Sequence, residues 1–329
     1  MGTLLANPDF VARFILFIVI TISFERNLDQ RLEDFLDRLD ETGLLPESGR
    51  EKGAAMVAKA LRFRNSALPE LVCAVAAIIM SAIPILSVTL DPAGADMMFA
   101  ASDDNRMKPA GWWILLVSSP IFWFLLFRWI WRIAVWSRLL LWISRLELQL
   151  VVTHPDKSGG IAFMGRYPNA FSPIVTAFSF DLAAIVFRQV GADEMSLEIY
   201  AFVMCSWLTI VLVVFLSPLT AFVVPLARLK ELALKEADTI DTRVQREKER
   251  AAFGRNLVGP SVETVADTSG ITDDPSKFRK AANELRLRPF SREAVLPLSG
   301  AAPVPLLLAG SGALPIKELF EVAKKLVLL

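Results

Sequence analysis

The stretch Ile199–Ala227, IYAFVMCSWLTIVLVVFLSPLTAFVVPLA, contains no charged residue. A helix needs about 20 apolar residues to cross the hydrocarbon core of a bilayer, and this stretch is longer than that. Backbone polar groups inside a bilayer must be paired within the protein, so an apolar run of this length predicts a membrane-spanning α-helix. The chain is therefore expected to be a helical membrane protein.

Four other segments approach the length and hydropathy of a membrane span. They are Phe10–Phe24, Ala67–Leu90, Gly111–Phe127 and Phe171–Val190. The first is short and is interrupted by Arg13, so we expect it either to cross the membrane or to lie in its interface. The other three join Ile199–Ala227 to form a predicted transmembrane core of four spans within residues 67–227.

Four further regions surround this core in the predicted all-α, polytopic fold. Residues 1–24 form the membrane or interfacial helix, and residues 25–66 form an amphipathic helical segment on the cytoplasmic side. Residues 228–292 form a charged helix followed by a loop. Residues 293–329 contain an apolar run broken by prolines and glycines, which favours a re-entrant or membrane-associated segment. The apolar residues of the second region recur at helical spacing: Leu28, Leu32, Phe35, Leu36 and Leu39.

Basic residues are concentrated in three of the polar connections. Residues 25–67 contain eight Lys and Arg, residues 128–170 contain six, and residues 228–292 contain fourteen. Residues 91–110 carry four aspartates against two basic residues, and residues 191–198 carry no basic residue. Because Lys and Arg accumulate in cytoplasmic loops, the three basic connections are predicted to be cytoplasmic and the other two external.

Composition argues against several classes of protein. Basic and acidic residues number 35 each, so no net positive field points to nucleic acid. The two cysteines, Cys73 and Cys205, lie in apolar runs, and His154 is the single histidine. A zinc site usually takes about three or four protein ligands, so we expect neither a metal nor a cofactor.

Two charged residues interrupt the predicted span Phe171–Val190. Asp181 lies midway along it, and Arg188 follows seven residues later on the same helical face. A charge at the centre of a bilayer costs about 2.5–3.5 kcal/mol on insertion scales, so it usually faces protein or water. Asp181 and Arg188 are therefore candidates for a pore or a proton relay. A salt bridge to another helix is an equal alternative for Asp181.

A stretch rich in tryptophan and arginine, FRWIWR at Phe127–Arg132, follows the span Gly111–Phe127. Both residue types are typical of a membrane interface, where the indole lies among headgroups and the guanidinium reaches phosphate. Arg128 and Arg132 are four residues apart and share one helix face. They are expected to mark the exit of the helix from the bilayer, with an anion or lipid-headgroup site as the alternative.

A polar turn, THPDKSGG at Thr153–Gly160, separates two apolar segments. Pro155 fixes one backbone angle, and the two final glycines permit positive φ. Successive backbone N–H groups in such a turn form an anion-binding nest. His154, Asp156 and Lys157 are therefore candidates for an anion or headgroup site, while a turn that returns the chain to the membrane also accounts for them.

Four short motifs occur in order along the chain: LRFRNS at Leu61–Ser66, FRWIWR, THPDKSGG, and RPF at Arg288–Phe290. Together they resemble an uncharacterised family of bacterial integral membrane proteins. The resemblance implies a bacterial source and an inner-membrane location. No activity is known for that family, so the resemblance implies no mechanism.

Two functional hypotheses remain open. The charged residues within a span favour an oligomeric channel or transporter for an ion or small solute, assembled as a homo-oligomer because five or six helices make a small bundle. The alternative is a membrane scaffold whose charged cytoplasmic helices bind a protein partner. An enzyme acting on lipid through His154 and Asp156 is not favoured, because no nucleophile, metal set or phosphate loop accompanies them.

Overall fold

The computed structural model of the protein describes residues 8–90, 109–191, 195–255, 258, 275–290 and 292–311. Within these ranges the regular elements are helices and no strand occurs, so the chain is an all-α, multi-pass membrane protein, as the sequence predicts. Four of the described helical stretches are long and apolar enough to cross a membrane, and they correspond to the four spans predicted within residues 67–227. They are Gly49–Ile83, Gly111–Ile143, Ala162–Val190 and Leu197–Thr220.

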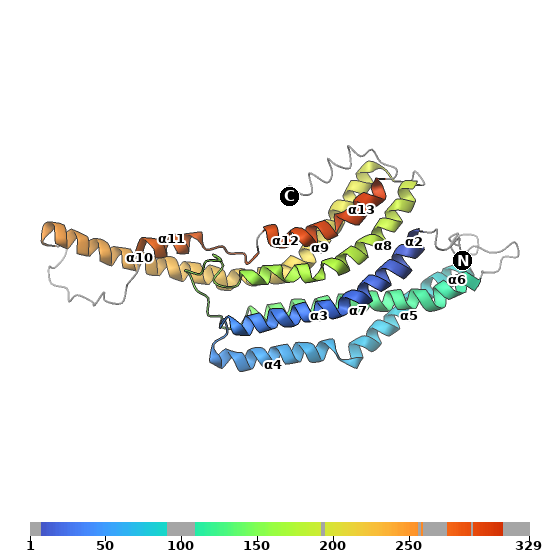
Figure 1. Cartoon of the computed structure of the whole chain (residues 1–329), viewed down its shortest axis with the longest axis horizontal. Helices are drawn as coiled ribbons and strands as arrows, with labels where there is room; N and C mark the ends of the chain where they lie inside the picture. The colour runs from blue at the N-terminus through green and yellow to red at the C-terminus, as the bar shows by residue number, and fades with distance from the viewer. Residues whose placement is uncertain are drawn as a thin grey trace.

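One continuous helix opens the described chain. It consists of α2 (Pro8–Val11), the π-helical turn η1 (Ala12–Leu16) and α3 (Phe17–Glu41). The segment Phe10–Phe24 is not one of the four apolar stretches, but it runs lengthwise beside α7 and α8 (Figure 1). This position favours a helix that crosses the bilayer over one that lies flat in the interface. In the second half of α3 the apolar repeat is buried: Leu28, Leu32, Phe35 and Leu39.

Two helical stretches complete one layer of the molecule together with this first helix. α4 (Glu47–Arg64) and α5 (Ala67–Leu90) are separated by a break at residues 65–66. α6 (Pro109–Trp113), the π-helical turn η4 (Ile114–Ser118) and α7 (Ser119–Ile143) form another continuous helix. At 1.5 Å per residue this last helix is about 50 Å long, whereas the hydrocarbon core is about 30 Å thick. Part of this helix is therefore expected to extend beyond the bilayer, and α7 packs against α3 and α4.

A second layer lies beside the first (Figure 1). It contains the 3₁₀ helix η5 (Ala162–Phe171), α8 (Ser172–Gly191) and α9 (Leu197–Thr220). α12 (Arg292–Ala301) and α13 (Pro303–Gly310) follow each other along α8. Within the described residues this pair is a single kinked path that does not turn back. The rest of the predicted segment 293–329, beyond residue 311, lies outside the described residues, as does most of the loop 91–110.

A close contact holds the far end of α13 against α9. The hydroxyl of Tyr200 donates a hydrogen bond to the carbonyl oxygen of Leu306 at 3.0 Å. A Cβ atom at Gly310 would lie only 2.7 Å from that hydroxyl oxygen, so the approach requires a glycine at this position. The contact fixes α12 and α13 parallel to the membrane-spanning helices.

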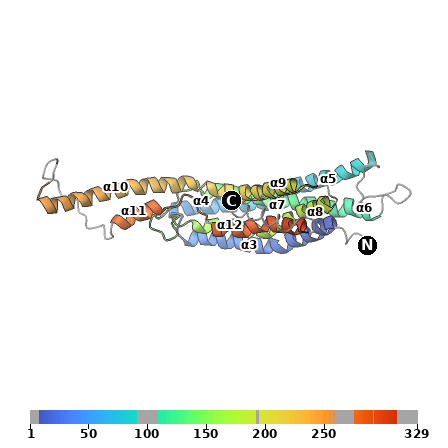
Figure 2. The ribbon, with the colours of Figure 1, turned by 90° about the horizontal axis from the view of Figure 1, so that it is seen from above.

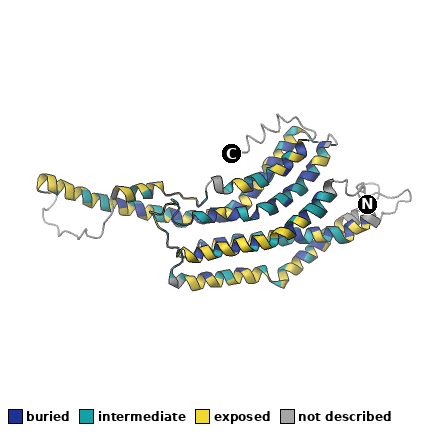
Figure 3. Ribbon diagram, in the orientation of Figure 1, coloured by how far each residue is buried: buried dark blue, intermediate teal, exposed yellow. Residues whose placement is uncertain are grey.

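The end of the molecule opposite this contact is polar. α10 (Val223–Phe253) continues from α9 and extends beyond the other helices, with α11 (Pro275–Glu284) alongside it (Figure 2). The last third of α10 is largely exposed, as are the outer faces of α3 and α4 (Figure 3). We refer to the end formed by α4, α10, α11 and the second halves of α3 and α7 as the polar end. Its charged surfaces indicate that it lies in water outside the bilayer.

The largest core cluster joins the two layers near the polar end. Its bulky members come from α7, η5, α9 and the start of α10, and they are nearly inaccessible to solvent. They include Trp129, Trp136, Tyr167, Phe171, Phe215 and Phe222. A smaller aromatic cluster lies further into the membrane region and is described with the site below.

Candidate functional site

Asp181 forms an ion pair with Arg13 of the first helix. The guanidinium donates to the carboxylate through Nε at 2.8 Å and through Nη2 at 3.5 Å. The pair connects α8 to the π-helical turn η1, and therefore one layer of helices to the other. The side chains of Arg13 and Asp181 remain 34% and 19% exposed, so the pair is partly buried. Of the alternatives left open for Asp181, the structure contains the salt bridge to another helix.

The depth of this pair follows from its place on the helix. Arg13 precedes Glu25 by twelve residues, which is about 18 Å at 1.5 Å per residue. Glu25 lies where the charged part of α3 begins. If it marks the edge of a hydrocarbon layer about 30 Å thick, Arg13 and Asp181 meet near the middle of that layer. An ion pair at this depth satisfies two charges that would each be costly alone.

Phenylalanine rings surround the pair on the side toward the polar end. The guanidinium carbon of Arg13 lies 5.2 Å from the centre of the Phe122 ring, a cation–π distance. Phe17 packs against Phe122 at 4.8 Å and against Phe178 at 5.3 Å between ring centres. These rings separate the pair from the charged residues nearer the polar end.

Local irregularities occur in both helices that approach the pair from the first layer. Arg13 itself lies in the π-helical turn η1, and α7 is preceded by the π-helical turn η4. Directly after η4, Ser119 donates a hydrogen bond to Ser81 of α5 at 3.2 Å. Isolated π-helical turns are found disproportionately at functional sites, because the extra residue redirects side chains. Here Arg13 lies in such a turn, and its side chain reaches Asp181 of α8.

Arg188 lies on α8 beyond Asp181 and is exposed. Its side chain is two helical turns further from the polar end than Asp181. It is therefore placed near the outer end of the span rather than at the Arg13–Asp181 contact.

Arg128 and Arg132 bind a carboxylate of the protein itself. Glu25 accepts hydrogen bonds from Arg128 at 2.8 and 3.1 Å and from Arg132 at 2.5 Å. Glu70 of α5 lies 3.8 Å from Arg128. Arg132 is 7% exposed, and its Nη1 is buried without a hydrogen-bond partner. The two arginines thus have an anionic partner supplied by α3, and their binding of a lipid headgroup stays a prediction.

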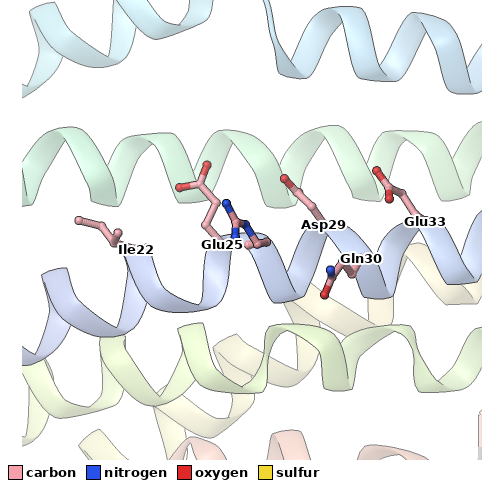
Figure 4. A pocket seen from close by; sticks show the side chains of 6 residues that line it. Ile22, Glu25, Asp29, Gln30 and Glu33 are labelled. Atoms are coloured by element: carbon pink, nitrogen blue, oxygen red, sulfur yellow. The ribbon is translucent and has the colours of Figure 1, made fainter.

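The second half of α3 presents further acids beside this cluster. Glu25, Asp29 and Glu33 point to the same side of the helix and line a shallow hollow there (Figure 4). Asp29 accepts a hydrogen bond from Arg64 at the end of α4, at 2.8 Å. The charged residues at this level therefore hold α3, α4, α5 and α7 together where the polar end begins.

The neighbouring tryptophans differ from the interfacial pattern that the sequence suggested. Trp129 and Trp136 are 1% and 4% exposed and belong to the protein core. Trp112 and Trp113, at the other end of the same helix, are 45% and 63% exposed. The exposed pair fits the aromatic belt of a membrane interface, whereas the buried pair packs the two layers together.

The carboxylate of Asp156 occupies the nest formed by the turn Thr153–Gly160. It accepts hydrogen bonds from three backbone N–H groups, those of Ser158 at 2.8 Å, Gly160 at 3.1 Å and Ala162 at 3.0 Å. Burial alone would raise the pKa of Asp156, but these donors and His154 together lower it below its usual value. Lys157, Gly159 and Gly160 adopt the positive φ that this geometry requires: 56°, 68° and 95°.

Lys157 connects this turn to the polar end. Its ammonium lies 2.8 Å from the carboxylate of Glu284 at the end of α11, and its carbonyl oxygen accepts from the backbone N–H of Arg286 at 2.7 Å. The hydrogen bond with Lys157 lowers the pKa of Glu284. The turn therefore has a structural role in the described residues, with its anion supplied by Asp156. Binding of an external anion there stays a prediction.

No group of three or more metal-ligating side chains occurs among the residues that the structure describes. No known protein family, curated protein or solved structure matches the chain. The class of protein is therefore defined by the fold alone: a multi-pass, all-α membrane protein in which an ion pair links the first helix to one of the four apolar stretches.

Proposed function

We propose that the protein is an oligomeric channel or transporter for an ion or small solute, located in the inner membrane of a bacterium with its polar end in the cytoplasm. The observation that carries the proposal is the Arg13–Asp181 pair. Ionisable residues inside a membrane are rare and usually mark ion or substrate pathways or proton relays. This pair joins two layers of helices, is partly exposed, and uses a π-helical turn to present its arginine.

The charged cluster at Glu25 also supports the proposal, because it differs from the Arg13–Asp181 pair in its position along the helices. Its residues lie where the helices leave the bilayer and hold four elements of the first layer together. The core cluster that contains Trp129 and Phe215 joins the two layers near the polar end, and the Arg13–Asp181 pair bridges them further along. Opening and closing of two helix groups around a midplane site is a general mode of membrane transport.

Assembly into a homo-oligomer is supported by the apolar faces that the chain leaves uncovered. On α5 these residues are between 49% and 70% exposed: Leu68, Leu71, Val72, Val75, Ile78, Ile79 and Ile83. Such a face contacts either lipid or a second copy of the chain. Mass measurement of the purified protein in nanodiscs distinguishes a monomer from an oligomer.

A flux assay tests the proposal. The purified protein is reconstituted into liposomes, and entry of potassium, chloride, nitrate and formate is measured against protein-free liposomes. We expect flux of at least one solute, reduced when Arg13→Gln and Asp181→Asn are combined. Glu249→Gln, on the exposed part of α10, is the matched control and leaves the flux unchanged. No flux of any solute, or flux unaffected by the combined change, would contradict the proposal.

The alternative role is that of a membrane scaffold. It is favoured by α10, whose last third extends beyond the body and exposes charged side chains on several faces. Cross-linking in native membranes at Arg246→Cys tests it. A product that contains a second protein supports the scaffold, and a product that contains only this chain argues against it.

A further inference from the structure

The two partners at the midplane differ in whether they can lose their charge. A guanidinium remains protonated in proteins, whereas a carboxylate becomes neutral by binding one proton. With Arg13 charged and Asp181 ionised, the site has no net charge. A transported solute must preserve that balance, because an uncompensated charge in the hydrocarbon layer is costly.

The balance discriminates between cations and anions. A cation that bound Asp181 would displace Arg13 and leave its positive charge without a partner. An anion that bound Arg13 would displace Asp181, whose negative charge is removed when the carboxylate takes up a proton. The second exchange starts and ends with a neutral site, and the first does not.

We propose, resting on the transport function above, that this site binds a small monovalent anion on Arg13 together with one proton on Asp181. The guanidinium of Arg13 exchanges the Asp181 carboxylate for the anion, and one oxygen of Asp181 receives a proton from the water on the side of entry. Release on the other side reverses both steps. One anion and one proton move together, and no net charge crosses the membrane.

In the described part of the chain, the elements around Asp181 provide no basic side chain other than Arg13 beside its carboxylate. α13 and its sequence PVPLLLAG contain no ionisable side chain, and α7 presents Phe122 to the guanidinium. On the first helix the next charged residue toward the polar end is Glu25, which is bound to two arginines. Arg188 on α8 lies about 10 Å from Asp181 along the helix and adds positive charge on the outer side.

The remaining elements packed against α8 carry their charges near its ends. They are Asp9 on α2, Arg292 and Glu293 on α12, and Arg166 on η5. Asp9 is an acid and precedes Arg13 by four residues, about 6 Å along the same helix, whereas the other three belong to segments at the end of α8 nearer the polar end. Arg13 is thus the basic group at the level of Asp181 to which an anion would bind among the described side chains.

The packing around the pair limits the size of the anion. The Phe122 ring lies 5.2 Å from the guanidinium carbon, and Phe17 and Phe178 close the side toward the polar end. An anion that replaces one carboxylate against Arg13 fits with little rearrangement if it is itself the size of a carboxylate. Chloride, nitrate and formate meet that requirement.

The experiment measures anion and proton entry together. The full-length protein is reconstituted into liposomes whose interior is buffered at neutral pH and contains a pH-sensitive dye. The liposomes are then placed in acidic medium that contains chloride, nitrate or formate. We expect the proton gradient to drive anion uptake with one proton per anion. Because no net charge crosses, setting the membrane potential with potassium and valinomycin is expected to leave the uptake rate unchanged. Potassium itself is not transported.

Variants separate the two binding events. Asp181→Asn is expected to abolish proton entry and to make anion uptake independent of the pH gradient. Arg13→Gln is expected to reduce anion uptake at least about tenfold, the loss expected when a charge-assisted hydrogen bond to the anion is removed. Glu249→Gln is expected to behave as the unchanged protein.

The outcomes distinguish this inference from the transport function on which it rests. If the unchanged protein carries no tested solute, the transport function fails and the inference falls with it. If it carries potassium, or carries an anion without protons, transport stands and the inference is overturned. If Asp181→Asn does not fold, the ratio of protons to anions in the unchanged protein decides alone.

Discussion

Arg13 and Glu25 lie on the same continuous helix, but the ion pairs that they form differ in composition and in place. Arg13 meets one carboxylate near the middle of the membrane region, and the pair is neutral. Glu25 meets two arginines at the start of the polar end, where one guanidinium nitrogen of Arg132 has no partner. The difference teaches that an isolated pair at the midplane cannot change partners without unbalancing its charge, whereas at the edge Glu70, Asp29 and Arg64 supply further charges beside the same cluster.

The largest stability effect is expected from breaking the midplane pair. Arg13→Ala leaves Asp181 without a partner in the hydrocarbon layer, and Asp181→Ala does the same to Arg13. Each change is expected to lower the free energy of unfolding by about 3 kcal/mol, as for other buried pairs that lose one partner. Chemical unfolding in detergent measures both.

The double variant sharpens this prediction. With both charges removed no group remains unpaired, so Arg13→Ala combined with Asp181→Ala is expected to be less destabilised than the sum of the single changes. Simple additivity of the two effects would show that the residues do not form a pair in the folded protein.

Removing the shared carboxylate at the membrane edge is expected to have a smaller effect. Glu25→Gln removes the carboxylate that Arg128 and Arg132 share and leaves Arg128 with Glu70 at 3.8 Å. The cost is about 2 kcal/mol, typical of lost hydrogen bonds to charged groups. Thermal unfolding in detergent measures it. Glu33→Gln, an exposed acid on the same helix, is the control, and an equal loss of stability in both variants would refute the difference between them.

Asp156 gives a pH-dependent prediction. Its pKa is lowered in the folded protein, so its contribution to stability is present above the unfolded value of about 3.9 and is lost as the pH falls through the folded value. Asp156→Asn is expected to cost about 1–2 kcal/mol at neutral pH, since three N–H donors lose a charged acceptor. Thermal stability measured from neutral to acidic pH should converge for the two proteins, and a constant difference would contradict this origin.

The smallest effect is expected where α11 meets α10. Arg279 binds Asp238 and Asp241 on the exposed surface, and this pairing raises the pKa of the guanidinium. Because exposed ion pairs are screened by salt, Arg279→Gln is expected to speed hydrogen exchange in α11 slightly, and less so at high salt. Exchange that is unchanged at low salt would show that the other contacts of α11 hold it without Arg279, among them the Lys157–Glu284 pair and the hydrogen bonds from Lys230 to the carbonyl oxygens of Asn283 and Leu285.

The sequence predicts the spans well and their contacts poorly, for a physical reason. Hydropathy over about 20 residues is a local property, so the four spans and the charge of Asp181 within one of them are predictable. The partner Arg13 lies 168 residues away, and this pairing depends on how the helices pack. Arg13 was visible as a charge in the first apolar segment, and pairing it with the midspan acid would have been the available signal.

Two features near the polar end could not be predicted from the residue types of the local sequence. The sequence of the turn Thr153–Gly160 predicts an anion nest, but it does not indicate that the carboxylate of Asp156 itself is the bound anion. Trp129 and Trp136 have the composition of an interfacial belt, yet α7 is long enough to carry them past the bilayer into the protein core.

Infrared difference spectroscopy tests the central claim most directly. The reconstituted protein is compared in acidic medium with and without chloride, which has no absorption in the carbonyl region. The exchange at Arg13 predicts that chloride produces the C=O band of a protonated carboxylic acid, and that Asp181→Asn lacks this band. Identical spectra with and without chloride, from protein that transports chloride in the flux assay, would contradict a role for Asp181 as the proton carrier.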